Sequence, residues 1–234
     1  PSVQTVAATV AELTRLDALS AVSATVTPLG HHLAALPVDL TTGKLMLYGA
    51  ALGCIDSALT IAAMTADKDV WMSGERRKEA EEKKRQLCGS WSDYATMLAA
   101  YNGWVRAVGE GRERGYCESQ GLLRERLREC QDRKRDYLES LVEMGLVALA
   151  QTGKDKRSWR PQRGVWRGAN GEELPVYSDG VRCAVHPHYT RHDDNLAMVN
   201  GAIVASLWPN IATNNKFTTQ QTGDSGNKGS KDDN

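Results

Sequence analysis

The stretch TPLGHHLAALPVDLTTGKLMLYGAALGCIDSALTIAA, residues 27–63, decides the fold of this chain. Thr27 precedes Pro28, a pairing that places a side-chain oxygen at the N-cap and a proline at the first helical position. A helix is therefore expected to begin at Pro28. It is expected to end near Leu36, because Pro37 disfavours the helical conformation in the residue before it.

Two more helices are expected in the rest of this stretch. Leucines and small residues fill Gly43–Gly53, which predicts a buried helix that packs closely on its neighbours. Asp56 is a candidate N-cap for a helix over Ser57–Thr65. The stretch contains no constellation of catalytic residues.

The composition favours a helical core. The chain has 234 residues, enough for one large domain or two small ones, and 41% of them are hydrophobic. Phe217 is its one phenylalanine, so leucine, alanine and valine must fill the core, which favours helices over a β-sandwich. Lysine plus arginine number 29, as do aspartate plus glutamate. The zero net charge argues against a globally basic nucleic-acid binder, although it leaves room for a local basic groove.

The cysteines indicate an intracellular protein. They are odd in number and scattered, which is typical of reduced thiols rather than of a disulfide framework. No apolar run reaches the roughly 20 residues that a membrane span needs, and no signal peptide is visible. We expect no membrane contact, and nucleus, cytoplasm and mitochondrion are not distinguished. Because the first residue is Pro1, we expect the chain to be a fragment or a processed product.

Hydrophobic periodicity predicts more helices on either side of the central stretch. Valines at helical spacing predict a short amphipathic helix over residues 2–16, and residues 18–26 suit a turn and a short strand. This order of helix, strand and helix is that of a reduced winged-helix unit. Residues 75–87 are nearly all charged, which favours a solvated helix with internal ion pairs over a helix that faces RNA. Further helices are expected over 92–108, 122–147 and 195–206.

Residues 151–194 break the helical pattern. They are rich in Gly, Arg, Trp and His without a sustained period, which predicts a long insertion or an irregular loop that contains β-structure. The tail 214–234 is polar and is predicted to be disordered. The predicted fold is thus mainly α. Its expected parts are a degenerate winged helix over 1–48, a helical bundle over 49–150, the insertion over 151–194, a closing helix over 195–213 and the tail.

Ordered motifs along the chain resemble one known family. The central stretch contains T-P-L-G-x-x-L-A-x-L-P-V-D and G-K-L-M-L-x-G-A-x-x-G-C-x-D-x-x-L-T-I-A-A. Further along are Ser92-Asp93-Tyr94, Tyr116-Cys117, Gly145-Leu146-Val147 and the run SLWPNIA at 206–212. Together they resemble the C-terminal region of DEAH-box RNA helicases, and the RNA helicase A-like branch most closely. The likeness covers about 1–150 and 195–213, and Tyr94 departs from the histidine usual at its place.

The resemblance implies an accessory part of a motor. In that family a winged helix and a helicase-associated helical domain form one wall of a channel for single-stranded RNA. They lie beside two RecA-like domains and an oligonucleotide-binding fold. ATP and Mg²⁺ would be used by the parent protein, which would move along RNA in the 3′-to-5′ direction. The alternative is a protein-interaction module that docks a helicase cofactor or a ribonucleoprotein partner, with little RNA contact.

The sequence of this chain predicts no nucleotide site. A phosphate-binding loop needs glycines at a fixed spacing before a Lys-Ser or Lys-Thr pair. Gly43-Lys44 lacks the earlier glycine and is followed by Leu45. We therefore predict no cofactor and no catalytic residue in this chain.

Cations of the 122–147 helix are the first candidates for RNA contact. Single-stranded RNA needs cations for its phosphates and amides or rings for its bases. Acidic residues interleave with these cations, so a solvated face with internal ion pairs is the competing interpretation. A carboxylate at the start of the 92–108 helix is another candidate, with a helix N-cap as the alternative. These candidates are Arg124, Arg126, Arg128, Lys134 and Asp93.

The basic and aromatic patch at 154–167 supplies the remaining candidates. Lysine and arginine dominate it and tryptophans interleave, a composition that fits adaptive contact with an RNA backbone. A surface loop whose tryptophans pack on the helical domain is the alternative. The candidates in the patch are Trp159, Arg160, Arg163 and Trp166.

Two other sets of residues favour a structural interpretation. Tyr101 and Trp104 could stack on bases, but rings at helical spacing belong more often to a core. Four further side chains have the types that zinc prefers, but they lack a paired Cys-x-x-Cys half and lie in one short segment. A polar loop is the better interpretation of these four, and no metal site is predicted. They are Cys183, His186, His188 and His192.

Overall fold

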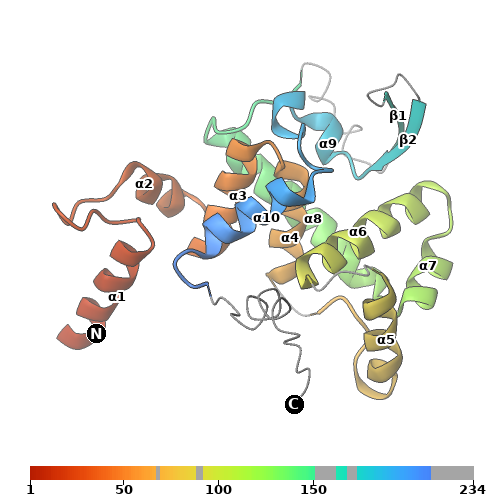
Figure 1. Ribbon diagram of the computed structural model, residues 1–234, viewed down its shortest axis with the longest axis horizontal. Coiled ribbons are helices and arrows are strands. Elements are labelled where there is room, and N and C mark those ends of the chain that lie inside the picture. Colours follow the sequence, from red (N-terminus) through yellow and green to blue (C-terminus); the bar gives the residue numbers. More distant parts are fainter. Residues whose placement is uncertain (67–68, 88–91, 151–161, 168–172, 212–234) are drawn as a thin grey trace, which may run out of the picture.

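The computed structural model is mainly helical, as predicted (Figure 1). It describes residues 1–66, 69–87, 92–150, 162–167 and 173–211, but only the backbone of Glu75, 162–167 and 173–176. The longer helices are α1 (Val3–Arg15), α2 (Pro28–Ala35), α3 (Leu40–Leu52), α4 (Ile55–Thr65), α5 (Arg77–Leu87), α6 (Asp93–Gly109), α7 (Glu113–Gln120), α8 (Arg124–Glu143) and α10 (Leu196–Leu207). The shorter elements are η1 (Gly74–Arg76), β1 (Gln162–Arg167), β2 (Glu173–Ser178), α9 (Val181–Ala184) and η4 (Pro187–Tyr189).

Helices α1 and α2 lie to one side of the main body (Figure 1). The start of α2 is the predicted one, since Oγ1 of Thr27 accepts a hydrogen bond from the N–H of Gly30 at 2.9 Å. A side chain at Gly30 would overlap the carbonyl oxygen of Ala18, so the glycine lets α2 approach the preceding chain closely. No residue of α1 is buried.

Residues 18–26 do not form the predicted short strand. The segment contains a single antiparallel bridge, between Leu19 and Val26. The chain reverses tightly around Ala24, whose φ of 53° lies in the left-handed region. Extended pairing over several residues is incompatible with this turn.

Helices α3 and α4 form a tight hairpin. Asp39 caps α3 by accepting a hydrogen bond from the N–H of Thr42 at 3.0 Å. Gly53 ends α3 in the left-handed conformation, which glycine adopts without steric cost. The predicted N-cap role of Asp56 is wrong, because α4 begins at Ile55, two residues before the predicted start at Ser57, and Asp56 lies within its first turn.

Helix α4 is the centre of the core. Every residue from Ile55 to Met64 is buried, and α3, α6, α8 and α10 pack around it. The contact of α3 with α4 depends on Gly49, where an added Cβ would overlap the Cβ of Ala58. A helix that is buried on all sides is stable only when neighbours cover it on all sides.

A second apolar cluster lies between α5, α6, α7 and α8. Tyr101 and Trp104 are each 1% exposed within it, and their rings meet at 5.4 Å between centroids. Their interpretation as core residues is therefore confirmed. Burial on this scale leaves neither ring a face on which a base could stack.

Helix α7 has no counterpart in the predicted elements. It is short, and its one buried residue is Cys117. It approaches α6 closely at Gly103, where an added Cβ would overlap the hydroxyl of Tyr116. Gly145 follows α8 with a φ of 71°, the left-handed conformation in which a glycine commonly ends a helix.

The 151–194 region contains the predicted β-structure. Strands β1 and β2 pair antiparallel in a hairpin, in a register that joins Gln162 to Ser178 and Arg167 to Glu173. The base of the hairpin lies on α6, since Tyr177 packs where Gly109 leaves room for its ring. The tail 214–234 falls outside the described residues.

Helix α10 closes the bundle by packing on α3 and α4. Oδ1 of Asn195 caps it by accepting hydrogen bonds from the N–H groups of Ala197 and Met198. In the described part of the chain, no helix has the length and apolar character that crossing a membrane requires.

Candidate nucleic-acid interface

Arg128 is exposed on α8 and is bound by a carboxylate of another helix. Its Nε and Nη2 donate to the two carboxylate oxygens of Glu113 at 3.0 and 2.7 Å. Nε1 of Trp104 donates to the same carboxylate at 3.2 Å. A phosphate that binds Arg128 must therefore compete with a two-bond carboxylate contact.

Arg124 and Arg126 bind carboxylates of α8 itself. Arg126 donates to Glu129 at 2.6 Å, and Arg124 donates to Glu125 at 3.2 Å. The Arg124 and Glu125 side chains are 43% and 72% exposed, so water screens this contact strongly. Arg124 is therefore the α8 arginine most easily recruited by a phosphate.

Lys134 is not a surface cation, and its prediction as an RNA-binding residue is wrong. Its side chain is 1% exposed. Its Nζ lies 2.7 Å from Oδ1 of Asp56 and 2.7 Å from Oδ2 of Asp179. The turn of α8 that carries Lys134 faces α4, so its ammonium neutralises buried carboxylates instead of phosphates.

Asp93 begins α6 and is well exposed. Ser92 is the N-cap, accepting a hydrogen bond from the N–H of Ala95 at 3.3 Å, while Asp93 occupies the first turn. A carboxylate there is favoured by the helix dipole. Asp93 also lies 3.7 Å from Nζ of Lys84, which stands over the ring of Trp71.

The candidates of the 154–167 patch are described only in part. Trp159 and Arg160 lie outside the described residues. Arg163 and Trp166 lie on β1, where they pair with Tyr177 and Leu174 of β2. The structure describes the backbone of these two residues but not their side chains.

Helix α5 presents cations that sequence analysis did not select. Arg77, Lys78 and Arg85 are exposed, and Lys83 is half-buried. Among the described residues these four make no ion pair, whereas Arg76 pairs with Glu79 at 3.3 Å. The predicted internal pairing of this charged segment is thus incomplete, and several of its cations are available to a ligand.

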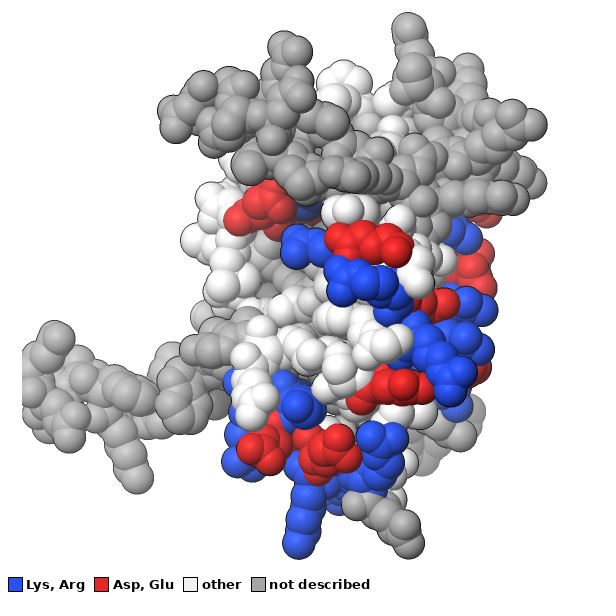
Figure 2. Space-filling view, turned by 90° about the vertical axis from the view of Figure 1, so that its right-hand side faces the viewer, with Lys and Arg blue, Asp and Glu red and all other residues white. Residues whose placement is uncertain are grey.

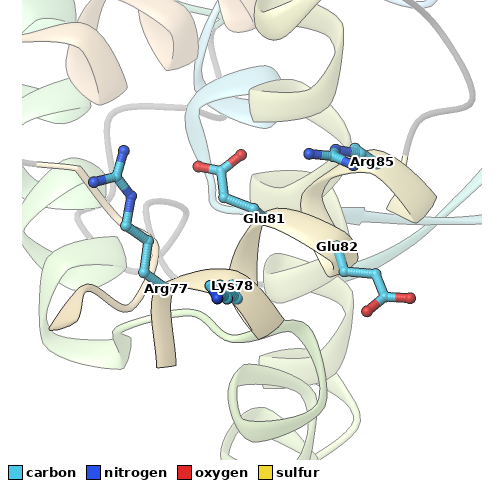
Figure 3. A pocket seen from close by; sticks show the side chains of 5 residues that line it. All are labelled: Arg77, Lys78, Glu81, Glu82 and Arg85. Carbon is cyan, nitrogen blue, oxygen red and sulfur yellow. The ribbon is translucent and has the colours of Figure 1, made fainter. Parts of the chain in front are cut away.

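The cations of α5 line a surface pocket. Its volume is about 570 Å³, and its described lining residues all belong to α5 (Figure 3). Figure 3 shows their side chains projecting from successive turns, with the guanidinium of Arg77 and the carboxylate of Glu82 on opposite sides of the helix. The lining residues are Arg77, Lys78, Glu81, Glu82 and Arg85.

The surface around α5 and α7 is mixed in charge but rich in cations. Figure 2 looks onto this side and shows Lys and Arg side chains in groups with Asp and Glu between them. A second pocket of about 290 Å³ lies where α7 meets the start of α8, and Arg114 and Arg124 are among its lining residues. Cations on α5, α7 and α8 therefore share one side of the molecule.

The histidine-rich segment does not gather into a metal site. In the parts of the chain with described coordinates, no group of three or more His, Cys, Asp or Glu side chains has a suitable arrangement for an ion. Nδ1 of His186 accepts a hydrogen bond from the N–H of His188, and Nδ1 of His188 lies 3.1 Å from Arg191. These contacts are those of a polar loop.

Comparison with protein families gives two adjacent matches. The winged-helix model of the helicase-associated domain HA2 matches residues 10–38, and its ratchet-like model matches residues 39–115. The second match begins at Asp39, the residue that caps α3. The chain belongs to the helicase-associated region of the DEAH-box RNA helicases.

Curated relatives carry this helicase-associated region within much longer proteins. The putative ATP-dependent RNA helicase DHX57 of Homo sapiens is 34% identical over 204 residues, which cover 84% of this chain and 14% of that protein. The ATP-dependent DNA/RNA helicase DHX36 of Bos taurus is 34% identical over 216 residues, or 91% of this chain and 18% of that protein. The DExH-box ATP-dependent RNA helicase DExH1 of Arabidopsis thaliana is 40% identical over 123 residues, or 52% and 12%.

The helicase-associated matches agree with the motifs that suggested the family. They end at residue 115, whereas the similarity to DHX57 extends over 204 residues. The predicted division into domains at 48, 150, 194 and 213 stays a prediction. The chain spans about a seventh of the length of DHX57.

Proposed function

We propose that this chain is the accessory C-terminal region of an ATP-dependent RNA helicase, where it lines the channel for single-stranded RNA and binds RNA without base specificity. Membership of the helicase-associated family supports the proposal, as do relatives whose names describe them as RNA helicases. ATP and Mg²⁺ would be bound by RecA-like domains of the parent protein. Those domains and an oligonucleotide-binding fold would be the neighbours of this region.

The observation that carries the proposal is the set of cations on α5 that make no ion pair with any described residue. Phosphate contacts provide affinity that is independent of sequence, because every nucleotide offers the same charged group. A cation that already binds a carboxylate must exchange one anion for another, which reduces its net contribution. Arg77, Lys78, Lys83 and Arg85 need no such exchange, because no described carboxylate binds them.

The charge of α5 favours phosphate despite its acidic residues. Between Arg77 and Leu87 the helix carries five cations and three glutamates, a net charge of +2. One face of α5 packs on α6 and α7, while Arg77, Lys78 and Arg85 are exposed to a ligand. Helix α5 should therefore contribute more to RNA affinity than the carboxylate-bound arginines of α8, of which Arg124 and Arg128 are the exposed candidates.

The test is equilibrium binding of a fluorescent single-stranded oligouridine of about twelve nucleotides, followed by anisotropy between about 50 and 200 mM salt. The double variant Arg77→Glu, Arg85→Glu should bind at least about tenfold more weakly at low salt. Its slope of log K against log salt should fall by about 1.4, that is, by about 0.7 for each lost phosphate contact. Oligoadenosine should bind with similar affinity, because no base edge is read.

Two comparisons make this test specific. Arg15→Glu makes the same change of charge as each α5 substitution, but on α1, which lies on the other side of the molecule (Figure 1). This variant should leave the affinity for RNA nearly unchanged. Arg124→Glu with Arg128→Glu should have an intermediate effect. Absence of binding at low salt, or an equal loss from Arg15→Glu, would contradict the proposal.

A protein-interaction module is the second candidate, and α1 is the observation that favours it. Val3, Val6 and Val10 are 86%, 48% and 42% exposed, and they lie at helical spacing on one stripe. An exposed apolar stripe on a helix is a common docking element for another protein. If the chain fails to bind RNA but Val6→Asp abolishes association with a helicase partner, this candidate replaces the first.

A further inference from the structure

Side chains from α4, α6 and α8 meet that of Asp179, the residue that follows β2, at the base of the hairpin. Nζ of Lys134 lies 2.7 Å from both Asp56 and Asp179. The hydroxyl of Tyr101 donates to Oδ2 of Asp179 at 2.7 Å, and the N–H of Val181 donates to its Oδ1 at 3.1 Å. Asp179 is therefore fully bound as an anion.

Asp193 joins this cluster from the segment just before α10, and it is bound much less well. Its side chain is 0% exposed. Oδ1 accepts a hydrogen bond from the N–H of Ser57 at 2.9 Å. Oδ2 has no hydrogen-bond donor among the described residues. Its nearest cation is Nε of Arg182 at 3.8 Å, and that nitrogen also lies 3.7 Å from Oδ2 of Asp56.

The charges of the cluster do not balance. Four carboxylates share two cations, Lys134 and Arg182; the carboxylates are those of Asp56, Asp179, Asp193 and Asp194. The two Nη groups of Arg182 donate to Asp194 at the surface, at 3.1 and 3.3 Å. A buried excess of negative charge is strongly unfavourable unless a proton neutralises it. Asp194 is exposed, and Asp56 and Asp179 each bind Lys134 directly. Asp193 is the carboxylate left for the proton.

We propose that the folded chain holds Asp193 as the neutral acid, and that this one proton latches the segment around α9 and the start of α10 onto α4. Asp193 binds the first turn of α4 at two points, since the hydroxyl of Ser57 donates to its carbonyl oxygen at 3.1 Å. Arg182 of α9 faces the same carboxylates. Loss of the proton places an uncompensated negative charge beside Asp56 and loosens this junction.

The electrostatic setting agrees with the geometry. Burial, and after it the charge of Asp56, raise the pKa of Asp193 to about 8, against the opposing effects of Arg182, the Ser57 N–H and Lys134. Burial also acts to raise the pKa of Asp179, yet the ammonium of Lys134 keeps it below its ordinary value.

Lys134, Cys54 and Arg182, which lie around this cluster, do not titrate in the same range. Burial lowers the pKa of Lys134, but Asp179 and Asp56 more than offset this, so the ammonium stays charged. Burial, and after it the charge of Asp193, raise the pKa of Cys54 to about 12, so that thiol stays protonated. Arg182, whose pKa is raised by its carboxylate neighbours despite its burial, also stays charged.

The proton is measured directly by the carboxyl ¹³C shift of aspartate in the 234-residue chain. One carboxyl resonance should titrate with a midpoint near 8, and it should be absent from the Asp193→Asn variant. The Asp194→Asn variant, which changes the exposed neighbour, should keep it. If no aspartate resonance titrates between about pH 7 and 9, the proposal is overturned whether or not the variants fold.

Stability supplies the second readout, with a definite sign. The pKa of Asp193 is higher in the folded than in the unfolded chain, so its contribution is greatest in acid and is lost as pH rises toward 8. The ratio of the folding constant of wild type to that of Asp193→Asn should fall about tenfold per pH unit between about pH 5 and 7. A ratio independent of pH would overturn the proposal.

Hydrogen exchange tests the latch itself. Protection of peptides covering 179–195, corrected for the chemical exchange rate, should fall about tenfold in wild type between about pH 7 and pH 9. The Asp193→Asn variant, which keeps an acceptor for the Ser57 N–H and carries no charge, should keep its protection. Equal loss of protection in the two proteins would show that the proton does not hold this junction.

Discussion

Replacing Lys134 by methionine should destabilise the fold severely, although the residue lies on a helix that is largely charged. Methionine preserves the length of the apolar stem but removes the ammonium. Asp56 and Asp179, each 2.7 Å from Nζ, then lose their shared counter-ion. The ammonium also stands 5.0 Å from the centroid of the Tyr101 ring. Breaking a buried ion pair by removing one partner costs about 3–5 kcal/mol, because the remaining charge is left uncompensated.

Urea unfolding followed by circular dichroism at neutral pH measures this loss. The matched control is Arg128→Met, which removes a cation from the same helix. The Arg128 side chain is 55% exposed, so loss of its contact with Glu113 should cost no more than about 1 kcal/mol. A cost below about 1 kcal/mol for Lys134→Met, or equal costs for the two variants, would refute the reasoning.

The cost of Lys134→Met should also depend on pH with a definite sign. Although burial opposes it, Lys134 lowers the pKa of Asp179 in the folded chain. Stability that comes from a lowered carboxyl pKa is present at neutral pH and is lost as the pH falls through the folded-state value. The difference between wild type and variant should therefore shrink in acid, and an unchanged difference would contradict this explanation.

Three further substitutions test the local structure by thermal or urea unfolding. Thr27→Ala removes the acceptor for the N–H of Gly30 and should cost about 1 kcal/mol. Gly49→Ala drives a Cβ into Ala58 and should cost about 1–3 kcal/mol, so a neutral effect would refute the close contact of α3 with α4. Gly115→Ala meets nothing within 4 Å and should stabilise α7 by about 0.5–1 kcal/mol.

The helical framework could be predicted from the sequence because its signals are local. Thr27 and Pro28 mark the start of α2, and Leu36 is its C-cap as expected from the following proline. Tyr101 and Trp104 are buried as their helical spacing indicated. Caps and apolar periodicity depend on residues within one or two turns, so one sequence is enough to read them.

The roles of single charged residues could not be predicted in the same way. Lys134 resembles its neighbours in a charged run, and only the packing of α8 on α4 turns it inward. Asp56 has the residue type of an N-cap, but it lies inside α4, where its carboxylate binds Lys134. Both roles depend on contacts between helices that are far apart in the sequence.

The distribution of free cations also depends on tertiary structure. Arg128 is bound by Glu113, which belongs to a different helix. The glutamates of α5 stand at spacings that allow pairing, yet Arg77 and Arg85 make no ion pair among the described residues. Sequence analysis therefore selected α8, whereas the structure offers more available cations on α5.

The most direct test of the central claim is photo-crosslinking of the chain to single-stranded RNA that contains 4-thiouridine, with the crosslinked peptides identified by mass spectrometry. The account predicts crosslinks in α5 and at the junction of α7 with α8, the side that carries the cations (Figure 2). These crosslinks should weaken as salt is raised. Crosslinks confined to α1 and α2, or none under conditions where the RNA is bound, would contradict the account.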